Sequence, residues 1–290
     1  MSTTQPAERW EATPEQLPRS RWARLLIAEN GIRWTAYAAL HSWLRTASRL
    51  VNDRMVRLER RHGLEGRTSV GVNYQFWQHW DWSRCGEEWT PTEEWKQSLI
   101  DDVMLAYLTP QTTILEIGPG AGRWTEVLQR IARRLIVVDL SDRCIELCRK
   151  RFARAVNMEL HVNDGRSLPF IADGSVDGVW SYDVFIHIAP RDVETYVAEI
   201  SRVLKRGGRA VIHHARAGRD GDAVNVGLRS TMTSDLFAEM VGTHGLRLIS
   251  QLDSWGPGGR FTFAVPTEWD IISVVEKSSV GPMITRPPMA

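Results

Sequence analysis

The chain has 290 residues, of which 43% are hydrophobic and 24% are charged. These values are typical of a globular protein with a buried core, and they exclude a chain that is disordered throughout. A formal net charge of +1 provides no overall field that would attract nucleic acid, so we expect no nucleic-acid partner.

The N-terminal segment and the cysteines indicate a cytoplasmic protein. The first twenty residues hold no apolar run of the kind found in secretory signals. The longest uncharged, apolar-leaning run in the N-terminal third, 34–44, is well short of the ~20 residues that span a bilayer. Cys85, Cys144 and Cys148 are odd in number and lack metal-ligand spacing, so we interpret them as reduced thiols and expect no metal site.

Residues 19–91 are expected to form a helical, tryptophan-rich extension or lid, after a disordered segment at 1–18. Two helical patterns meet at the stop signal Asn30-Gly31. In the second pattern, apolar residues recur at spacings of three and four as far as Gly63, which places them on one stripe of a helix. The members of this stripe are Tyr37, Leu40, Leu44, Ala47, Val51, Met55 and Leu58.

The same segment is strongly basic. Residues 19–61 hold ten arginines, no lysine and three acidic residues, a local net charge of +7. Two interpretations stay open. In the first, the stripe packs on the rest of the chain or on a partner subunit of a homo-oligomer. In the second, the helix lies on an anionic membrane surface as a peripheral contact.

Tryptophans are dense just before the main domain. Five of them occur between residues 74 and 95: Trp77, Trp80, Trp82, Trp89 and Trp95. They either pack as ordinary core or cover a cavity or a partner. The sequence Thr90-Pro91-Thr92-Glu93 then predicts a capping box, with the proline at the first position of a helix that runs to about Leu108.

Residues 92–277 alternate short apolar strands with amphipathic helices, which predicts βαβ units and a parallel sheet. Strands are expected at 113–117, 134–138, 158–162, 176–181, 209–214, 246–255 and 270–276, and helices at 122–133, 142–153, 191–204 and 234–243. The last two strands have no helix between them, so they should pair antiparallel. The predicted fold is α/β, a doubly wound, mostly parallel seven-stranded sheet with an antiparallel terminal hairpin and an N-terminal helical extension. The tail at 278–290 is expected to be disordered.

A glycine-rich turn follows the first predicted strand, in the sequence ILEIGPGAG at 114–122. Glycines at such a turn let a ligand approach the backbone and the N-terminus of the next helix. The fingerprint of dinucleotide-binding proteins requires a small residue where this chain has Arg123, which disfavours a nicotinamide-dependent oxidoreductase.

Two acids follow the next two strands. Asp139 ends the second strand about twenty residues after the glycines, where a carboxylate can accept hydrogen bonds from both hydroxyls of a ribose. Asp164 follows the third strand, where it could accept the amino group of an adenine. Together with the glycine turn, these acids indicate a ligand that contains adenosine.

With these motifs, residues 92–277 resemble the class I, Rossmann-like, S-adenosylmethionine-dependent methyltransferase family, whose fold includes the terminal hairpin. The resemblance implies S-adenosylmethionine as the cofactor. By the resemblance, Glu116 would engage the amino group of the cofactor through the turn, and the three glycines Gly118, Gly120 and Gly122 would line its methionine portion.

The remaining cofactor contacts implied by the resemblance follow the later strands. Asp139 would bind the ribose, and Leu140 beside it is counted among the cofactor-binding residues. Asp164 and Gly165 would flank the adenine, and Ser181 would border the sulfonium.

The acceptor is expected to be a hydroxyl of a small molecule, such as a sugar, a polyketide or a lipid-linked intermediate. Family members that methylate base amines often carry an Asn/Asp-Pro-Pro-aromatic motif after the fourth strand, where this chain has Ser181-Tyr182-Asp183-Val184. The polar segment 217–233 is of the kind that builds acceptor pockets. Methylation of nitrogen or carbon, and a protein that binds the cofactor without catalysis, remain as alternatives.

A hydroxyl acceptor needs a base, and a histidine suits that task at neutral pH. His187 follows the fourth strand, and His213 and His214 end the fifth, all at the carboxyl edge of the sheet where ligands of such folds bind. Neighbouring strand residues point to opposite faces, so at most one of the pair faces the site. We predict His187 and His214 as catalytic candidates; the alternative is that all three are structural.

Overall fold

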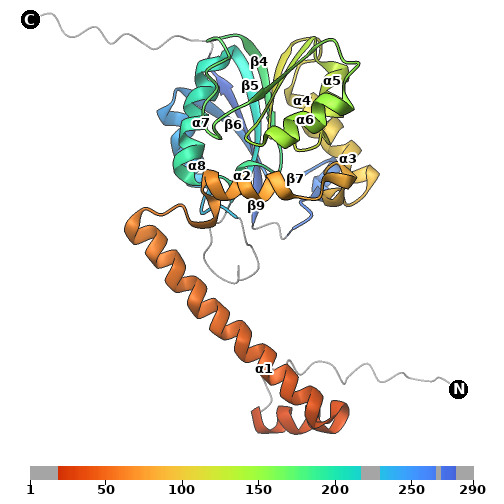
Figure 1. Cartoon of the computed structure of the whole chain (residues 1–290), viewed down its shortest axis with the longest axis vertical. Coiled ribbons are helices and arrows are strands. Elements are labelled where there is room, and N and C mark those ends of the chain that lie inside the picture. The colour runs from red at the N-terminus through yellow and green to blue at the C-terminus, as the bar shows by residue number, and fades with distance from the viewer. Residues whose placement is uncertain (1–18, 217–228, 266–268, 279–290) are drawn as a thin grey trace, which may run out of the picture. The chain divides into compact units, whose positions relative to one another are not determined.

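The computed structural model describes residues 19–216, 229–265 and 269–278. The chain divides into two compact units, a helical one that ends at Gly63 and a larger one that begins at Leu64 and contains the β-sheet (Figure 1). Residues 64–91, expected as part of the extension, therefore belong to the unit with the sheet. The segment 1–18 and nearly all of the tail 278–290, both expected to be disordered, lie outside the described residues, as does most of the polar segment 217–233.

The helical unit consists of α1 (Arg19–His62). Its backbone is non-helical at Gly31, with φ 80° and ψ 161°, which confirms the break predicted at Asn30-Gly31. The helix ends directly before Gly63, whose φ of 61° suits glycine. None of the described helices is long and apolar enough to cross a membrane.

The larger unit is built on a seven-stranded sheet with the order β3-β2-β1-β4-β5-β9-β6. Its strands are β1 (Thr113–Ile117), β2 (Arg134–Asp139), β3 (Met158–Val162), β4 (Val176–Ser181), β5 (Leu204–Ala215), β6 (Leu246–Leu252) and β9 (Asp270–Lys277). β1 to β5 pair in parallel, and β9 is antiparallel to both β5 and β6. This arrangement confirms the predicted sheet and its terminal hairpin.

The connection from β6 to β9 is more elaborate than predicted. The strand expected over 246–255 is interrupted after Leu252, and Ser254–Trp255 (β7) pairs with Phe261–Thr262 (β8) in a separate two-stranded sheet. The glycine-rich turn between them forms a short 3-10 helix, Pro257–Gly259.

Helices cover both faces of the main sheet (Figure 1). One face packs against α5 (Thr125–Ile131), α6 (Asp142–Arg151) and a continuous helical segment made of α3 (Glu93–Leu99), a π-helical turn (Ile100–Met104) and α4 (Leu105–Tyr107). The other face packs against α7 (Pro190–Val203) and α8 (Ser234–Thr243). Alternate residues of β1 serve the two layers, since Leu115 and Ile117 face α7 while Ile114 faces α5.

Two helix starts differ from prediction. The N-cap of α3 is Thr92, whose hydroxyl accepts from Trp95 N, so the predicted cap at Thr90 with Pro91 inside the helix is wrong. The Thr90 hydroxyl instead donates to Glu87. α5 begins at Thr125 and not at Gly122, because the positive φ of Gly122 (94°) keeps the turn out of helical conformation.

Candidate cofactor and acceptor site

The glycine turn after β1 lies at the point where the strand order reverses, between β1 and β4. Ligands of doubly wound sheets bind at such points. Gly118 and Gly120 have φ values of 74° and 56°, and a Cβ at Gly118 would overlap the side chain of Val184. At Gly120 a Cβ would lie 2.7 Å from the Trp82 ring. Larger residues would therefore strain the turn and push its neighbours away.

Two buried carboxyls lie at this turn. Asp139, at the end of β2, accepts from Ser141 N at 2.8 Å and from Gly120 N at 3.3 Å, and burial raises its pKa to about 6. Glu116 is 1% exposed, and neither of its carboxylate oxygens makes a hydrogen bond of ordinary geometry to a described residue. Burial raises the pKa of Glu116 to about 8, and the charge of Asp139 adds to the rise against the opposing Thr125 hydroxyl and Arg123.

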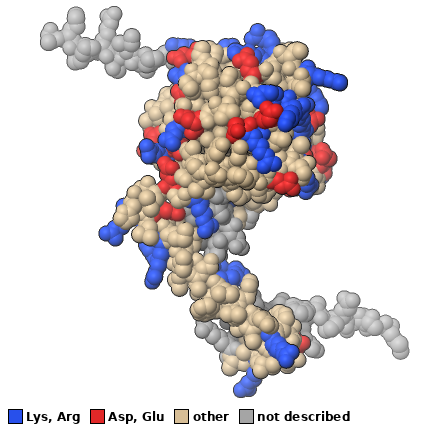
Figure 2. Space-filling view, viewed as in Figure 1, with Lys and Arg blue, Asp and Glu red and all other residues tan. Residues whose placement is uncertain are grey.

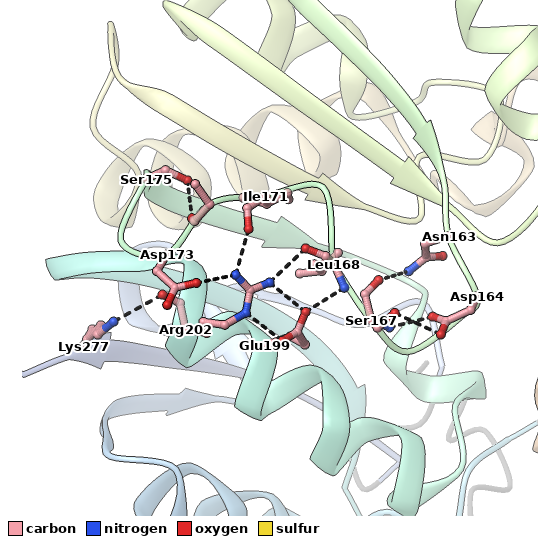
Figure 3. A network of polar contacts seen from close by, with 11 residues as sticks. Asn163, Asp164, Ser167, Leu168, Ile171, Asp173, Ser175, Glu199, Arg202 and Lys277 are labelled. Atoms are coloured by element: carbon pink, nitrogen blue, oxygen red, sulfur yellow. Dashed lines mark hydrogen bonds and ion pairs between the residues drawn. The ribbon is translucent and has the colours of Figure 1, made fainter.

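The loop after β3 presents Gly165 to the site and holds Asp164 outside it. Gly165 lines the pocket, and its backbone N donates to Asn163 Oδ1. The exposed Asp164 carboxylate accepts from Arg166 N, Ser167 N and the Ser167 hydroxyl, so it shapes its own turn (Figure 3). The Asp164 carboxylate therefore faces its own turn, and Asp164 is not among the residues that line the pocket.

Arg202 of α7 fastens that loop. Its guanidinium donates to the carbonyls of Leu168 and Ile171 and pairs with Asp173 and Glu199 (Figure 3). Glu199 in turn accepts from Leu168 N at 2.7 Å. The loop is thus held to α7 from several directions, which fixes where Gly165 lies.

The pocket has a volume of about 880 Å³, its open mouth included. It is bounded by the sheet edge and by residues 64–91, called the tryptophan-rich segment below. From the sheet come Gly118, Gly120, Asp139, Leu140 and Gly165, so the turn and the ends of β2 and β3 border one space. From the tryptophan-rich segment come Val70, Asn73, Trp77, Trp82 and Trp89. Both open interpretations of the tryptophans apply, because Trp95 packs in the core while these three rings line the pocket.

Hydrogen bonds hold the tryptophan-rich segment in place. Asn73, in α2 (Val70–His79), donates to the carbonyl of His187 at 2.8 Å. Gln78 accepts from the Ser141 hydroxyl, and its carbonyl accepts from Arg143. The wall of the pocket is therefore tied both to the segment after β4 and to the start of α6.

A buried chain of charges runs behind the pocket. Asp183 lines the pocket with a left-handed backbone (φ 61°), and its carboxylate pairs with Arg123 and with His213 Nδ1. On its other side, His213 Nε2 lies 3.4 Å from the carboxylate of Asp270. That carboxylate accepts hydrogen bonds from both terminal guanidinium nitrogens of Arg229. Burial favours the neutral form of the Asp183 carboxyl. Arg123 and His213 favour its charged form more strongly, and they hold the pKa of Asp183 far below its usual range. Burial likewise opposes the charge of His213, whose pKa the two carboxylates nevertheless raise.

Of the two histidines predicted as bases, only His187 lines the pocket. His187 lines the pocket, and its ring centroid lies 5.1 Å from that of Trp77. His214 does not reach the pocket: it is fully buried against Phe237, with its ring nitrogens bonded to Ala215 O and the Ser273 hydroxyl. Burial lowers the pKa of His214 to about 3, so the structure contradicts the expectation that it acts as a base.

The Ser181 hydroxyl is also engaged in a hydrogen bond within the protein. Its buried hydroxyl donates to the carbonyl of Ile117 at 2.9 Å and does not line the pocket. This bond joins the ends of β4 and β1 at the switch point, so Ser181 borders the site through the backbone it fixes.

Residues 115–212 match the family model described as a methyltransferase domain. The match covers the glycine turn, both acids and the strands up to β5, and the sheet order agrees with it. These residues form a class I S-adenosylmethionine-dependent methyltransferase domain. S-adenosylmethionine is therefore the cofactor of the domain.

Individual relatives resemble this chain over parts of their length. A probable ribosomal RNA small subunit methyltransferase A of Methanosarcina acetivorans is 40% identical over 68 residues, 23% of this chain and 25% of the relative. A demethylmenaquinone methyltransferase of Tropheryma whipplei is 30% identical over 105 residues, 36% of this chain and 42% of the relative. The chain thus spans between a quarter and about two fifths of these curated relatives, and their named acceptors differ.

A solved structure supports the fold. A chain of the complex between the Haloferax volcanii Trm112 methyltransferase activator and a candidate methyltransferase superposes with a TM-score of 0.54 at 18% identity. The superposition covers 70% of this chain and 97% of that one.

The methyltransferase site fits its cofactor on two observations. The buried carboxylate oxygens of Glu116 receive no hydrogen bond of ordinary geometry from the part of the chain that is described, and a cationic amino group would supply the missing partner. The positive-φ glycines leave a cradle that a Cβ would fill. Sequence reasoning missed Arg123 as a site residue; it lines the pocket, is 4% exposed, and its Nη1 has no hydrogen-bond partner among the described residues. The only signal was its position directly after the glycines.

Proposed function

We propose that the protein transfers a methyl group from S-adenosylmethionine to a hydroxyl of a small molecule in the cytoplasm. The observation that carries the proposal is that His187 lines the same pocket as the glycine turn and Asp139. A candidate base for the acceptor and the groups that hold the donor therefore border one space.

The cofactor would be held by residues from three strand ends. Asp139 would accept hydrogen bonds from the ribose hydroxyls, and Leu140 and Gly165 would border the adenine. Glu116 faces the amino group through the turn of Gly118, Gly120 and Gly122. Arg123 is added to the predicted set, because its unpartnered Nη1 at the pocket suits the carboxylate of the methionine portion. Asp164 and Ser181 are assigned to shaping the backbone around these contacts.

S-adenosylmethionine supplies a methyl group made electrophilic by its sulfonium. The residues of this chain then orient the acceptor oxygen in line with that methyl group, and such positioning can lower a barrier by ~7 to 11 kcal/mol. Trp77, Trp82 and Trp89 exclude water from one side of the pocket. As the acceptor oxygen bonds to the methyl carbon, the carbon–sulfur bond of the sulfonium would break and leave a neutral thioether, and a ring nitrogen of His187 would take the hydroxyl proton. Asp183 is paired with Arg123, which makes it a poor proton acceptor, and His213 is not among the residues that line the pocket.

A few buried polar acceptors in the mostly apolar lining of the pocket favour an acceptor with several hydroxyls. Asp192, at the start of α7, has a side chain that is 1% exposed and lies 3.4 Å from Arg166 Nη1, yet its oxygens make no hydrogen bond of ordinary geometry to a described residue. Asn73 Oδ1 is likewise buried with no hydrogen-bond partner among the described residues, and both residues line the pocket. Hydroxyl donors on a sugar, a polyketide or a lipid-linked intermediate would satisfy these acceptors, while the tryptophan rings contact its apolar faces.

The test is to incubate the full chain with methyl-labelled S-adenosylmethionine and a panel of hydroxylated sugars, polyketides and lipid-linked compounds. Product structure is then determined by mass spectrometry and NMR. We expect the label on an oxygen atom. A label on nitrogen or carbon would refute the hydroxyl assignment, and cofactor binding without transfer to any compound would favour a protein that binds the cofactor without catalysis.

A further inference from the structure

The helical unit carries a long apolar stripe that no other described part of that unit covers. Most large stripe residues of α1 are exposed, among them Tyr37 at 72%, and so are two tryptophans of the same helix, Trp43 at 64% and Trp34 at 51%. The part of α1 after Gly31 is about 45 Å long. Exposed apolar surface on this scale marks an interaction site.

The same helix is basic and aromatic. Arg33, Arg45, Arg54 and Arg57 are exposed along it, and the whole segment 19–61 has a net charge of +7. In the space-filling view, blue arginine side chains are scattered among neutral ones along this unit (Figure 2). Tryptophan and tyrosine have one apolar and one polar edge, so they favour the headgroup level of a bilayer.

From these two observations we propose that α1 is a membrane-surface helix, whose apolar stripe enters one leaflet of a bilayer rich in anionic lipid. Its arginines pair with the lipid phosphates, and Trp34 and Trp43 lie at the headgroup level. The helix lies in the plane of the surface, because it is too polar to cross it. The methyltransferase unit is thereby recruited to a membrane, which goes beyond its proposed chemistry and does not depend on it.

Charge selects this occupant over a second copy of the chain. A partner helix of identical sequence would bring its own charge of +7, and the repulsion would oppose parallel pairing. A two-stranded contact would also leave Trp34 uncovered, since it lies more than 90° around the helix from Leu40 on the stripe. An anionic surface meets both the arginines and the apolar residues at once.

The experiment uses the full chain and vesicles of phosphatidylcholine with or without phosphatidylglycerol, in a sedimentation assay. The test variant is Leu40→Glu with Leu44→Glu, which places two charges on the stripe. The control is Ser42→Glu with Thr46→Glu, which makes the same charge change at exposed positions two residues away and so about 200° around the helix. Circular dichroism checks that helix content is kept, and light scattering reports the oligomeric state.

We expect binding to phosphatidylglycerol vesicles at least about tenfold tighter than to phosphatidylcholine alone, weakened severalfold by about 0.5 M salt. The stripe variant should lose at least about tenfold in binding, and the control should lose less, only through its charge. Equal losses in the two variants, equal binding to both lipids, or no binding at all would overturn the proposal. A stripe variant that changes only the oligomeric state would show that α1 pairs with a second copy.

Discussion

Glu116 and Asp139 are two neighbouring acids buried at one turn, and their burial has a cost that the cofactor can relieve. In the free protein their pKa values are raised to about 8 and about 6. Both are raised above the unfolded values, so the folded state binds more protons than the unfolded chain between about pH 4 and 8, and stability falls as pH rises through that window. At pH 7 Glu116 is therefore mostly protonated.

Cofactor binding is expected to release a proton from Glu116. A cationic amino group near the carboxyl favours its charged form and lowers its pKa. Calorimetric titration with S-adenosylmethionine at pH 7, in buffers of different ionisation enthalpy, should show release of up to about one proton. In Glu116→Gln the release should be lost. A release that is absent in the unmodified protein, or unchanged in the variant, would remove Glu116 from the amino-group site.

His187 is predicted to affect turnover and not cofactor affinity. His187→Ala should lower the methylation rate by about 100-fold or more, as expected when a general base is lost, and should change the affinity for S-adenosylmethionine only a few-fold. The matched control is His79→Ala, an exposed histidine at the end of α2. Equal rates in the two variants would show that His187 is not the base.

At the scale of elements, Arg202 ties the loop after β3 to α7, and its removal should loosen Gly165. Arg202→Ala breaks bonds to two carbonyls and two carboxylates, so we expect a loss of about 2 kcal/mol in the free energy of unfolding, measured with urea. Cofactor affinity should fall as well. Arg130→Ala, which removes an exposed pair with Glu126 on α5, should cost less than about 0.5 kcal/mol. Similar losses in both variants would contradict the fastening role.

Strand positions were predictable because buried parallel strands are short apolar runs. β1, β3 and β4 have the predicted bounds, and β5 begins earlier because Leu204 already pairs with Val176. Helix starts were less predictable. Thr90 and Thr92 are both suitable caps, and the sequence does not show that the Thr90 hydroxyl bonds to Glu87 while the Thr92 hydroxyl caps the helix.

The choice between His213 and His214 shows where the sequence stops being informative. Alternation along β5 indicates that the two side chains face opposite layers, but it does not say which layer holds the site. The structure places His213 against Tyr182 and Phe263, with Asp183 beside it, and His214 against Phe237 of α8. The backbone of Asp183 is left-handed, and this conformation directs its carboxylate. Such a conformation is uncommon in residues other than glycine, so the sequence did not predict it.

At the scale of the whole molecule, the pocket is assembled from segments distant in sequence. Trp77, Trp82 and Trp89 precede β1, and His187 follows β4, yet all line one space. The density of tryptophans indicated a cavity or a core without saying which. Residues 64–91 therefore belong to the same compact unit as the matched segment 115–212 and contribute side chains to its pocket.

The most direct measurement is a calorimetric titration of the full chain with S-adenosylmethionine, repeated with Asp139→Ala and with Asp142→Ala, an exposed acid of α6, as the control. We predict one-to-one binding by the unmodified protein and the control. For Asp139→Ala we predict affinity at least about 100-fold weaker with unchanged circular dichroism, because two ribose hydroxyls lose a charged acceptor. No binding by the unmodified protein, or equal binding by Asp139→Ala, would contradict the account.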